Sequence, residues 1–383
     1  MAFLIGQTAA YLAVCGLIAQ HDTVSPRVIV LCVALAGAAR LPLIWMPDLP
    51  ARDAIRYVWD ARVQRAGLDP YRTRPDDLAV DHLHTALTRR VDASWLPTIY
   101  PPVAQLYFRG VTAVSESLTA FRAAAILSDL VTSVALMALL QAVGRPAAWS
   151  LLYAWHPVIL YESAAGGHLD AFGVAVLTLG LLAVRRGRPT LAALLIVSAI
   201  LVKPLPIVLA PLLWQRLRMR DVLVALVWAS IALVTITGGS LPLGSLGAFV
   251  DDFRFNGPAF RLLTAALPPR AVAGLAVVLG LSVACWLRFG RRAVEDWATP
   301  QAVALVLAPV IYPWYLAWVV PFAVLAGSVV PWAWSVGVVA IYPAWWLASR
   351  GAPFEVPPSL LVLQYGLAAV VTAAAARETI RHR

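Results

Sequence analysis

The chain is dominated by apolar stretches of about 20 residues, the length that an α-helix needs to cross a bilayer. Backbone polar groups in lipid must be satisfied within the segment, so such stretches predict an all-α polytopic membrane protein. Only 13% of the 383 residues are charged, against roughly 25% in soluble domains. We expect one polytopic membrane domain over residues 1–383. Nine stretches of this kind occur near 3–20, 28–46, 121–143, 147–164, 168–184, 220–237, 271–290, 329–348 and 358–376.

Short clusters of arginine separate these stretches and carry most of the formal net charge of +10. Basic residues concentrate on the cytoplasmic side of membrane proteins, so the clusters indicate which helix ends face the cytoplasm. The pattern differs from the continuous basic patch of a nucleic-acid-binding protein, and we expect no nucleic-acid partner. We predict a multi-pass protein of the cell membrane with these cytoplasmic residues: Arg145; Arg185, Arg186 and Arg188; Arg216, Arg218 and Arg220; Arg288, Arg291 and Arg292; Arg377, Arg381 and Arg383.

Two further apolar stretches, 190–214 and 299–327, are long enough to cross but are interrupted by proline. The first begins and ends at predicted cytoplasmic arginines, so it must enter the membrane and return. We expect its tip at 203–206 and a similar tip at 312–315 in the second. Irregular backbone at membrane depth is tolerated only where it lines a protein or water-filled cavity. A third break precedes Pro157. We expect the three breaks to point into a common interior, and about 11–13 membrane helices in all, counting broken and half helices.

Lys203, in the middle of 190–214, is the only lysine in a chain with 29 arginines. A charged side chain at membrane depth is costly and usually faces a polar cavity or an ionic partner, which makes Lys203 a candidate site residue. A lysine near the end of an ordinary helix can instead extend its ammonium to the interface. Because Pro204 opens the backbone beside it, we favour a buried ammonium that binds an anion, for which a lipid-linked phosphate is the obvious candidate.

The arginine pattern leaves two large segments on the outer side of the membrane, 47–120 and 238–270. The first is rich in arginine, but eight arginines alternate with seven aspartates between residues 51 and 97, and long loops follow the charge rule weakly. Within this first external loop we predict a short amphipathic helix over 53–66. Residues 99–117 are expected to lie along the outer membrane surface or to dip into it.

Asp53, Arg56 and Asp60 fall on the short helix predicted in the first external loop, at spacings that make them neighbours. One interpretation is a salt-bridged surface helix. The other is a carboxylate held at the membrane edge as a general base and oriented by Arg56. The spacing alone does not choose between them.

The segment 161–170 joins two predicted membrane helices and contains Glu162, His168 and Asp170. His168 begins the second helix, where a helix N-terminus favours anions, and its Gly-Gly-His turn offers N–H groups and an imidazole together. The alternative is a polar turn in which Asp170 is a favourable charge in the first turn of the helix.

Two other features have competing structural explanations. For Asp129, a lone acid inside a predicted helix, pairing with an arginine is favoured over direct chemistry. The aromatic cluster Trp314, Tyr315 and Trp318 is either an interfacial belt, which is the more common case, or a platform on which a sugar stacks.

No motif in the sequence indicates a cofactor. Cys15, Cys32 and Cys285 all lie in apolar stretches and predict neither a disulfide framework nor a metal site. The sequence contains no Walker loop, no dinucleotide fingerprint and no His-Glu-x-x-His zinc motif. We therefore expect no cofactor and no metal.

Six segments carry a family resemblance: DAIRYVWDARVQRAGLDPY (53–71), TIYPPVAQLYF (98–108), SDL (128–130), HPVILYESAAGGHLDAF (156–172), LVKPLPIVLAPLL (201–213) and IYPWYLAWVVPF (311–322). In wording and order they resemble the GT-C superfamily of polytopic glycosyltransferases, most closely its bacterial glycosyltransferase 87-like and GPI mannosyltransferase I-like branch. The resemblance implies a GT-C-like fold. It also implies inverting transfer of a hexose, with mannose favoured, from a polyprenyl-phosphate donor to a glycolipid or glycan acceptor at an extracytoplasmic active site.

The resemblance also implies which residues act. A catalytic acid in the first external loop corresponds to Asp53, with Asp60 as the second choice. Family members often carry two acids at or near this position, whereas this chain has Arg52-Asp53, so a metal-binding role is not implied. The implied residues are Lys203, His168, Arg56 and Tyr100 at the donor phosphate, and Tyr57, Asp170, Glu162, Trp314 and Tyr315 at the substrate.

Two other classes of function remain open from the residues. A transporter or flippase of a lipid-linked or anionic substrate would also have broken helices and a charged residue at membrane depth. A non-catalytic assembly subunit is the third possibility, and it requires Asp53 to be dispensable. The large charged first loop favours the enzyme, because a transporter has little use for it.

Overall fold

The computed structural model describes residues 2–20, 24–47, 53–239, 241–290 and 295–381. In these residues the backbone is helical or irregular, apart from an isolated bridge between Phe255 and Val310, and the predicted all-α class is confirmed. The α-helices are α1 (Ala2–Gln20), α2 (Pro26–Arg40), α3 (Asp53–Arg65), α4 (Pro102–Val114), α5 (Leu118–Ala142), α6 (Leu151–Ala154), α7 (Pro157–Tyr161), α8 (Asp170–Arg185), α9 (Pro189–Ile200), α10 (Met219–Thr237), α11 (Leu246–Asp252), α12 (Pro258–Leu263), α13 (Pro269–Phe289), α14 (Ala298–Val306), α15 (Val320–Ala326), α16 (Val329–Gly337), α17 (Pro343–Ala348) and α18 (Pro358–Arg381). The shorter segments are the 3-10 helices η1 (Leu41–Trp45), η2 (Leu78–Leu83), η3 (Thr88–Arg90), η4 (Ala147–Ser150), η6 (Leu205–Leu213), η7 (Pro313–Trp318) and η8 (Val338–Ile341), and the π-helical turn η5 (Glu162–Gly166).

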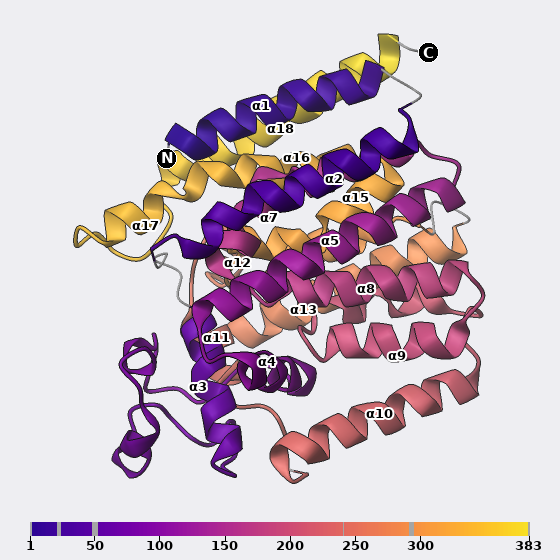
Figure 1. Ribbon diagram of the computed structural model, residues 1–383. Helices are drawn as coiled ribbons and strands as arrows, with labels where there is room; N and C mark the ends of the chain where they lie inside the picture. The colour runs from indigo at the N-terminus through magenta and orange to yellow at the C-terminus, as the bar shows by residue number, and fades with distance from the viewer. Residues whose placement is uncertain (1, 21–23, 48–52, 240, 291–294, 382–383) are drawn as a thin grey trace.

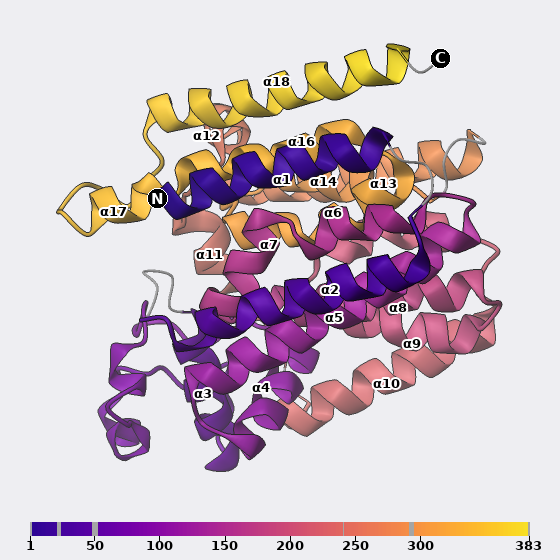
Figure 2. The same cartoon turned by 45° about the horizontal axis from the view of Figure 1, so that its top comes forward.

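The long helices lie side by side in one bundle, with α10 along one edge and α1 and α18 along the opposite edge (Figures 1 and 2). Helix α8 packs between α5 and α9, and α9 packs in turn against α10. Proline begins many of the helices, which suits the first turn because its missing N–H has no partner there. The Ser117 hydroxyl caps α5 by accepting a hydrogen bond from the Ala120 N–H at 3.2 Å.

Among the described residues, six segments are long and apolar enough to cross a membrane: Pro26–Trp45, Leu118–Ala142, Met219–Thr237, Pro269–Phe289, Val329–Ala348 and Pro358–Ala375. Three shorter helices are also apolar: Ile5–Ile18, Pro189–Ile200 and Pro313–Ala326. The polytopic membrane class is thus supported by length and composition. The larger total of membrane helices expected from the sequence stays a prediction.

The described arginine clusters gather at one end of the bundle, on the right in Figure 1. There Arg185 donates hydrogen bonds to the Ala142 carbonyl at 3.1 Å and to Glu295 Oε1 at 3.0 Å. Arg145 donates to the Ala326 carbonyl at 2.8 Å. The described parts of the two predicted external loops lie at the opposite end, and the side of the membrane that each end faces stays a prediction. Three of the predicted cytoplasmic arginines lie outside the described residues: Arg291, Arg292 and Arg383.

The stretch 190–214 enters the bundle and returns, as predicted. The Thr190 hydroxyl, near the start of α9, donates to Asp221 Oδ1 near the start of α10 at 2.6 Å. Further along, Trp228 Nε1 of α10 donates to Ser198 Oγ of α9 at 2.9 Å. Helices α9 and α10 therefore run parallel, so η6 must reverse the direction of the chain between them (Figure 1).

The stretch 299–327 forms a second returning pair of half helices. Its flanking residues, Glu295 before α14 and Ala326 at the end of α15, both contact arginines at the same end of the bundle. Between the two helices the chain leaves helical geometry after Val306 and resumes it in η7. The predicted tip at 312–315 is the start of η7.

The third break has a different environment from the other two. Helix α6 ends before His156 and α7 begins after it, so the break itself is confirmed. His156 Nε2 lies 3.0 Å from Ser335 Oγ, and the edge of its ring contacts Tyr11 with centroids 5.2 Å apart. The expectation that all three breaks point into one interior is wrong here, because α1 and α16 pack around this break.

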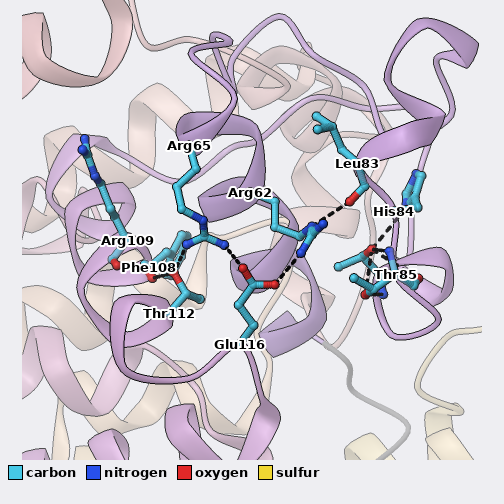
Figure 3. Close-up of polar contacts among 10 residues, drawn as sticks. Arg62, Arg65, Leu83, His84, Thr85, Phe108, Arg109, Thr112 and Glu116 are labelled. Atoms are coloured by element: carbon cyan, nitrogen blue, oxygen red, sulfur yellow. Dashed lines mark hydrogen bonds and ion pairs between the residues drawn. The ribbon is translucent and has the colours of Figure 1, made fainter.

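Helix α3 matches the short helix predicted in the first external loop, but it is not a surface helix. Eight of its thirteen residues are buried, including the fully buried Trp59. Figure 3 shows how it is fixed: Arg62 and Arg65 of α3 both pair with Glu116, and Arg65 also donates to Thr112 Oγ1 at 2.8 Å. These contacts join α3 to α4 and to the start of α5. Burial therefore places most of α3 within the protein, although Asp53 at its start stays partly exposed.

Asp129 pairs with an arginine, as predicted. Arg40 Nε at the end of α2 lies 3.4 Å from Asp129 Oδ2 on α5, and both side chains are 1% exposed. The Tyr153 hydroxyl donates to the other carboxylate oxygen at 2.8 Å. The pair joins α2 to α5 in the interior.

Candidate active site

Four segments that are far apart in the sequence meet toward the loop end of the bundle. They are the start of α3, the turn between η5 and α8, the hinge between α9 and η6, and η7. The first two come together at Asp53 and His168, and the last two at Lys203 and Tyr315. A contact between Lys203 and Asp170, the first residue of α8, links the two halves.

His168 lies between two carboxylates. Its Nδ1 is 3.7 Å from Asp53 Oδ2, and its Nε2 is 3.1 Å from Glu162 Oε2. One face of the ring stacks on Trp314, with centroids 3.9 Å apart and planes 11° apart. The His168 side chain is 1% exposed, whereas that of Asp53 is 34% exposed. The imidazole is therefore enclosed, while the carboxylate of Asp53 beside it is partly exposed.

The backbone of the turn between η5 and α8 is shaped to hold the imidazole. The wide turn of η5 ends at Gly167, whose φ of 67° is in the left-handed region that favours glycine. A Cβ on Gly166 would lie 2.7 Å from His168 Nε2, so only glycine leaves room for the ring there. The Gly-Gly pair thus permits the histidine to fold back toward Glu162.

Lys203 forms an ion pair with a buried aspartate. Its Nζ lies 2.7 Å from Asp170 Oδ1 and 3.2 Å from the centroid of the Tyr315 ring. Trp318 Nε1 donates to the same Asp170 oxygen at 2.6 Å. Lys203 does not extend away to an interface, yet its side chain remains 20% exposed while that of Asp170 is 2% exposed. The ammonium is held in place and can still contact a further anion.

The hinge beside Lys203 is fixed by the first external loop. A broken helix leaves carbonyl groups without partners, and the first turn of another helix leaves N–H groups free. Here the Leu201 carbonyl accepts hydrogen bonds from the N–H groups of Val103 at 3.0 Å and Ala104 at 3.2 Å, in the first turn of α4. The free carbonyl after the end of α9 and the free N–H groups at the start of α4 thus satisfy each other's hydrogen bonds.

Tyrosines fill the space between α3, α4 and the turn before α8. The Tyr57 hydroxyl accepts a hydrogen bond from the Leu169 N–H at 3.5 Å, and its ring meets the edge of Tyr100 with centroids 5.2 Å apart. Tyr57 also stacks on Phe108 at 4.3 Å. The carbonyl of Tyr100 accepts from the Tyr71 hydroxyl at 2.7 Å. Tyr57 and Tyr100 therefore lie beside the turn that carries His168, and their contacts with the substrate and the donor phosphate stay predictions.

The surroundings of Asp53 raise the pKa of its carboxyl above that of an ordinary aspartate. Crowding by protein atoms removes water and is the largest cause, although a third of the side chain stays exposed. His168 and Lys203 oppose the rise with their positive charges, while Asp170 and Asp92 add to it. A carboxylate with a raised pKa is a stronger base, and partial exposure allows a second molecule to reach it.

Asp60 does not join this cluster. It lies two turns along α3 from Asp53, is 1% exposed, and accepts hydrogen bonds from Thr98 Oγ1 at 2.5 Å and Gln105 Nε2 at 2.9 Å. Burial raises its pKa to about 6, against the lowering effect of Arg56, Thr98 and Gln105. The structure gives Asp60 a role in joining α3 to the start of α4, and a catalytic role for it stays a prediction.

Arg56 also points away from Lys203 and His168. Its guanidinium donates to the backbone carbonyls of Asp92 at 3.0 Å, Ala93 at 2.8 Å and Leu96 at 3.1 Å. These contacts hold the 92–96 part of the first loop against α3, in place of the aspartate pairs that a salt-bridged surface helix would have. A role for Arg56 at the donor phosphate stays a prediction.

The aromatic cluster of 314–318 is part of the interior. Trp314 is 3% exposed and Trp318 is fully buried, so the interpretation as an interfacial belt is wrong. Trp314 covers His168, Tyr315 lies against Lys203, and Trp318 binds Asp170. These side chains form the inner wall of the charged cluster.

Tyr342 is a site residue that the sequence reasoning missed. Its hydroxyl donates a hydrogen bond to Glu162 Oε1 from just before α17. A sequence signal was present, because the tripeptide Ile-Tyr-Pro occurs at 99–101, 311–313 and 341–343. All three tyrosines lie in or beside the site: Tyr100 against Tyr57, Tyr312 stacked on Trp314 at 4.5 Å, and Tyr342 on Glu162.

The fold defines a polytopic helical membrane protein, and these groups form a cluster of acidic and cationic side chains within its bundle. Comparison with known families shows to which family the chain belongs. The model of the family described as "Alpha-(1->6)-mannopyranosyltransferase, N-terminal domain" matches residues 2–218, more than half of the chain. The chain therefore belongs to this family. The matched region includes Asp53, Glu162, His168, Asp170 and Lys203, whereas η7 and Tyr342 lie beyond it.

A curated relative agrees with the family assignment. The chain is similar to "Alpha-(1->6)-mannopyranosyltransferase A" from Corynebacterium glutamicum, with 26% identity over 340 residues, 72% of this chain and 67% of the relative. The family and this relative support a membrane mannosyltransferase of the GT-C branch, as the sequence resemblance implied.

Proposed function

We propose that this protein transfers mannose from a polyprenyl-phosphate donor to a glycolipid or glycan acceptor, with its active site facing the extracytoplasmic side of the membrane. The family description and the name of the Corynebacterium relative support the sugar and the type of transfer. The six membrane-length segments support a substrate drawn from the lipid phase. The proposal needs no cofactor and no metal.

Asp53 is the proposed general base. Its raised pKa and partial exposure suit a carboxylate that accepts the proton of an acceptor hydroxyl. As that proton moves to Asp53, the acceptor oxygen bonds to the anomeric carbon of the mannose. The bond between this carbon and the phosphate oxygen breaks on the opposite face, so the configuration inverts and polyprenyl phosphate leaves.

The leaving phosphate gains negative charge in this step and needs cations or N–H donors nearby. Lys203 Nζ has one partner in Asp170 and remains 20% exposed, so it has N–H groups left for a phosphate oxygen. His168 lies beside Asp53 on the same cluster. We assign both residues to the donor phosphate. Tyr57, Tyr100, Trp314 and Tyr315 are the proposed contacts of the substrate, and Asp170 contributes by holding Lys203.

One observation carries the proposal. Asp53, His168 and Lys203 come from three separate parts of the chain, yet their charged groups lie close enough to influence one another electrostatically. A base and two cations in one partly open cluster are what acid–base transfer from a phosphate donor requires.

The test is to incubate the purified protein in detergent with extracted membrane lipids, as the source of the acceptor, together with one donor at a time: polyprenyl-phosphate mannose, glucose or arabinose. Mass analysis should show loss of the mannose donor, release of polyprenyl phosphate and a product heavier by one hexose. Asp53→Asn should give none of these. A folded wild-type protein that consumes no polyprenyl-phosphate sugar, but uses a nucleotide sugar, would contradict the proposed donor class.

A further inference from the structure

Glu162, which the resemblance places at the substrate, also has two partners within the protein. The side chain is buried, Oε1 accepts a hydrogen bond from the Tyr342 hydroxyl, and Oε2 faces His168 Nε2 at 3.1 Å. Tyr342 is contributed by the C-terminal part of the chain, 180 residues away in the sequence. Glu162 therefore links η8 and α17 to the catalytic cluster.

The charge state of His168 follows from its two neighbours. Both ring nitrogens face carboxylate oxygens, Nδ1 toward Asp53 and Nε2 toward Glu162. Two carboxylates within ion-pair distance on opposite sides of a buried ring favour the imidazolium over the neutral imidazole. Asp170 is a third carboxylate within electrostatic range of the ring. These acids, with Lys203 on the far side of Asp170, are the charged groups that face His168.

Burying Glu162 as a carboxylate is costly unless a cation and hydrogen bonds compensate for the lost water. The imidazolium supplies the cation, and the Tyr342 hydroxyl satisfies the oxygen that His168 does not reach. Trp314 on the ring face and the lack of room at Gly166 leave the imidazole little freedom to rotate. Glu162 and Tyr342 can thus set both the charge and the direction of the ring.

We propose that Glu162 and Tyr342 are positioning residues that keep His168 doubly protonated, with its Nδ1–H directed to the Asp53 side of the cluster where the donor phosphate binds. This rests on the proposed function for the phosphate, but the charge and orientation of His168 can be measured without any substrate. It gives Glu162 a role as an internal partner of His168 and assigns a function to Tyr342.

The spectroscopic test uses the full-length protein in detergent, labelled with ¹⁵N-histidine. The chain has six histidines, and the signal lost in His168→Gln identifies the residue. At about pH 7 the wild-type His168 should show the imidazolium pattern. Glu162→Gln, which has nearly the same shape, should convert it to a neutral tautomer, and Tyr342→Phe should shift it partly in the same direction.

Tyr107→Phe is the matched control. The Tyr107 hydroxyl is buried and has no hydrogen-bond partner among the described residues, so its loss should leave His168 unchanged. A neutral His168 in the wild type, or an imidazolium signal that persists in Glu162→Gln, would overturn the proposal. Tyr342→Phe provides a second measurement if Glu162→Gln does not fold.

The kinetic test uses polyprenyl-phosphate mannose as the donor. Misdirection of a group at the reacting centre should lower kcat about 100-fold in Glu162→Gln and about tenfold in Tyr342→Phe, with smaller changes in KM. An unchanged kcat in both variants counts against the proposal. If the wild type fails to consume the donor, the proposed function fails, and the ¹⁵N spectra still decide whether Glu162 protonates His168.

Discussion

The Arg40–Asp129 and Lys203–Asp170 ion pairs each contain a buried aspartate, and they differ in access. Arg40 and Asp129 are each 1% exposed, and the Tyr153 hydroxyl donates a hydrogen bond to the second oxygen of the Asp129 carboxylate. In the other pair, Asp170 is 2% exposed while Lys203 remains 20% exposed. Both acids are equally removed from water. Only in the second pair can the cation contact another molecule. We therefore call Arg40–Asp129 the closed pair and Lys203–Asp170 the open pair.

The difference arises from the backbone around each pair. Arg40 and Asp129 are positioned by long helices, α2 and α5, whose packing leaves no opening. Lys203 follows the end of α9 and precedes Pro204, in a hinge whose exposed carbonyl is satisfied by α4. A continuous helix thus buries an ion pair as a structural link, whereas a broken helix presents one to a site.

The largest predicted effect is on the rate of sugar transfer, and it is expected for Asp53, which lies in the same charged cluster as the open pair. Asp53→Asn should lower sugar transfer by at least about 1,000-fold, because an amide cannot accept the proton of the acceptor. The rate of mannose transfer measures this, with gel filtration in detergent to verify folding. Asp129→Asn, in the closed pair, is the control and should keep its activity in the folded fraction. Full activity in Asp53→Asn would remove Asp53 as the base.

The largest predicted effect on stability is expected at the closed pair, Arg40–Asp129. Arg40→Ala leaves Asp129 as an uncompensated buried charge and should cost about 3–5 kcal/mol of unfolding free energy. Thermal unfolding in detergent should show a clear drop in Tm. The double variant Arg40→Ala, Asp129→Asn should recover part of it. An unchanged Tm in Arg40→Ala would show that the closed pair is not a structural link.

A smaller and different effect is expected at the open pair. Lys203→Ala should weaken binding of the polyprenyl-phosphate donor about 10- to 100-fold, because a partly exposed charge-assisted contact to the phosphate is lost. Lys203→Arg should recover only part of this, because a planar guanidinium does not reproduce a compact ammonium. Donor titration of the purified variants measures both. Wild-type affinity in Lys203→Ala would mean that the exposed ammonium does not bind phosphate.

The smallest predicted effect concerns Asp60. This carboxylate also lies on α3, but outside the charged cluster of Asp53, His168 and Lys203. Its folded pKa of about 6 is above that of an unfolded aspartate, so protonation stabilises the fold at low pH and this stability is lost as the pH rises through about 6. Asp60→Asn mimics the protonated form and should be more stable than wild type by about 1–3 kcal/mol above that pH.

The advantage of Asp60→Asn should disappear below about pH 4, where both states of the wild type are protonated. Tm measured across this range tests the prediction, and mannose transfer in Asp60→Asn should stay within about threefold of wild type at neutral pH. A loss of transfer as large as that of Asp53→Asn would make Asp60 the base.

Much of the fold could be predicted because the constraints on a membrane chain are local. The length of 190–214 and the arginines at its two ends were enough to predict that it returns to the side from which it starts. For 299–327, length and the proline break indicated a similar return. The same reasoning identified Lys203 as exceptional and Asp129 as a structural partner of an arginine. It misjudged the break at Pro157, because a proline marks where a helix is interrupted but not which neighbours cover it.

The sequence by itself determined an all-α membrane protein with two returning half-helix pairs, and it identified most residues of the charged cluster. Only the tertiary structure decided their partners. Asp170 with Lys203, Trp318 with Asp170, and Tyr342 with Glu162 join residues 33, 148 and 180 positions apart. Helical periodicity carries information over a few turns, whereas these contacts depend on how whole helices pack. Packing is also what separates the accessible Asp53 from the enclosed Asp60 on one short helix.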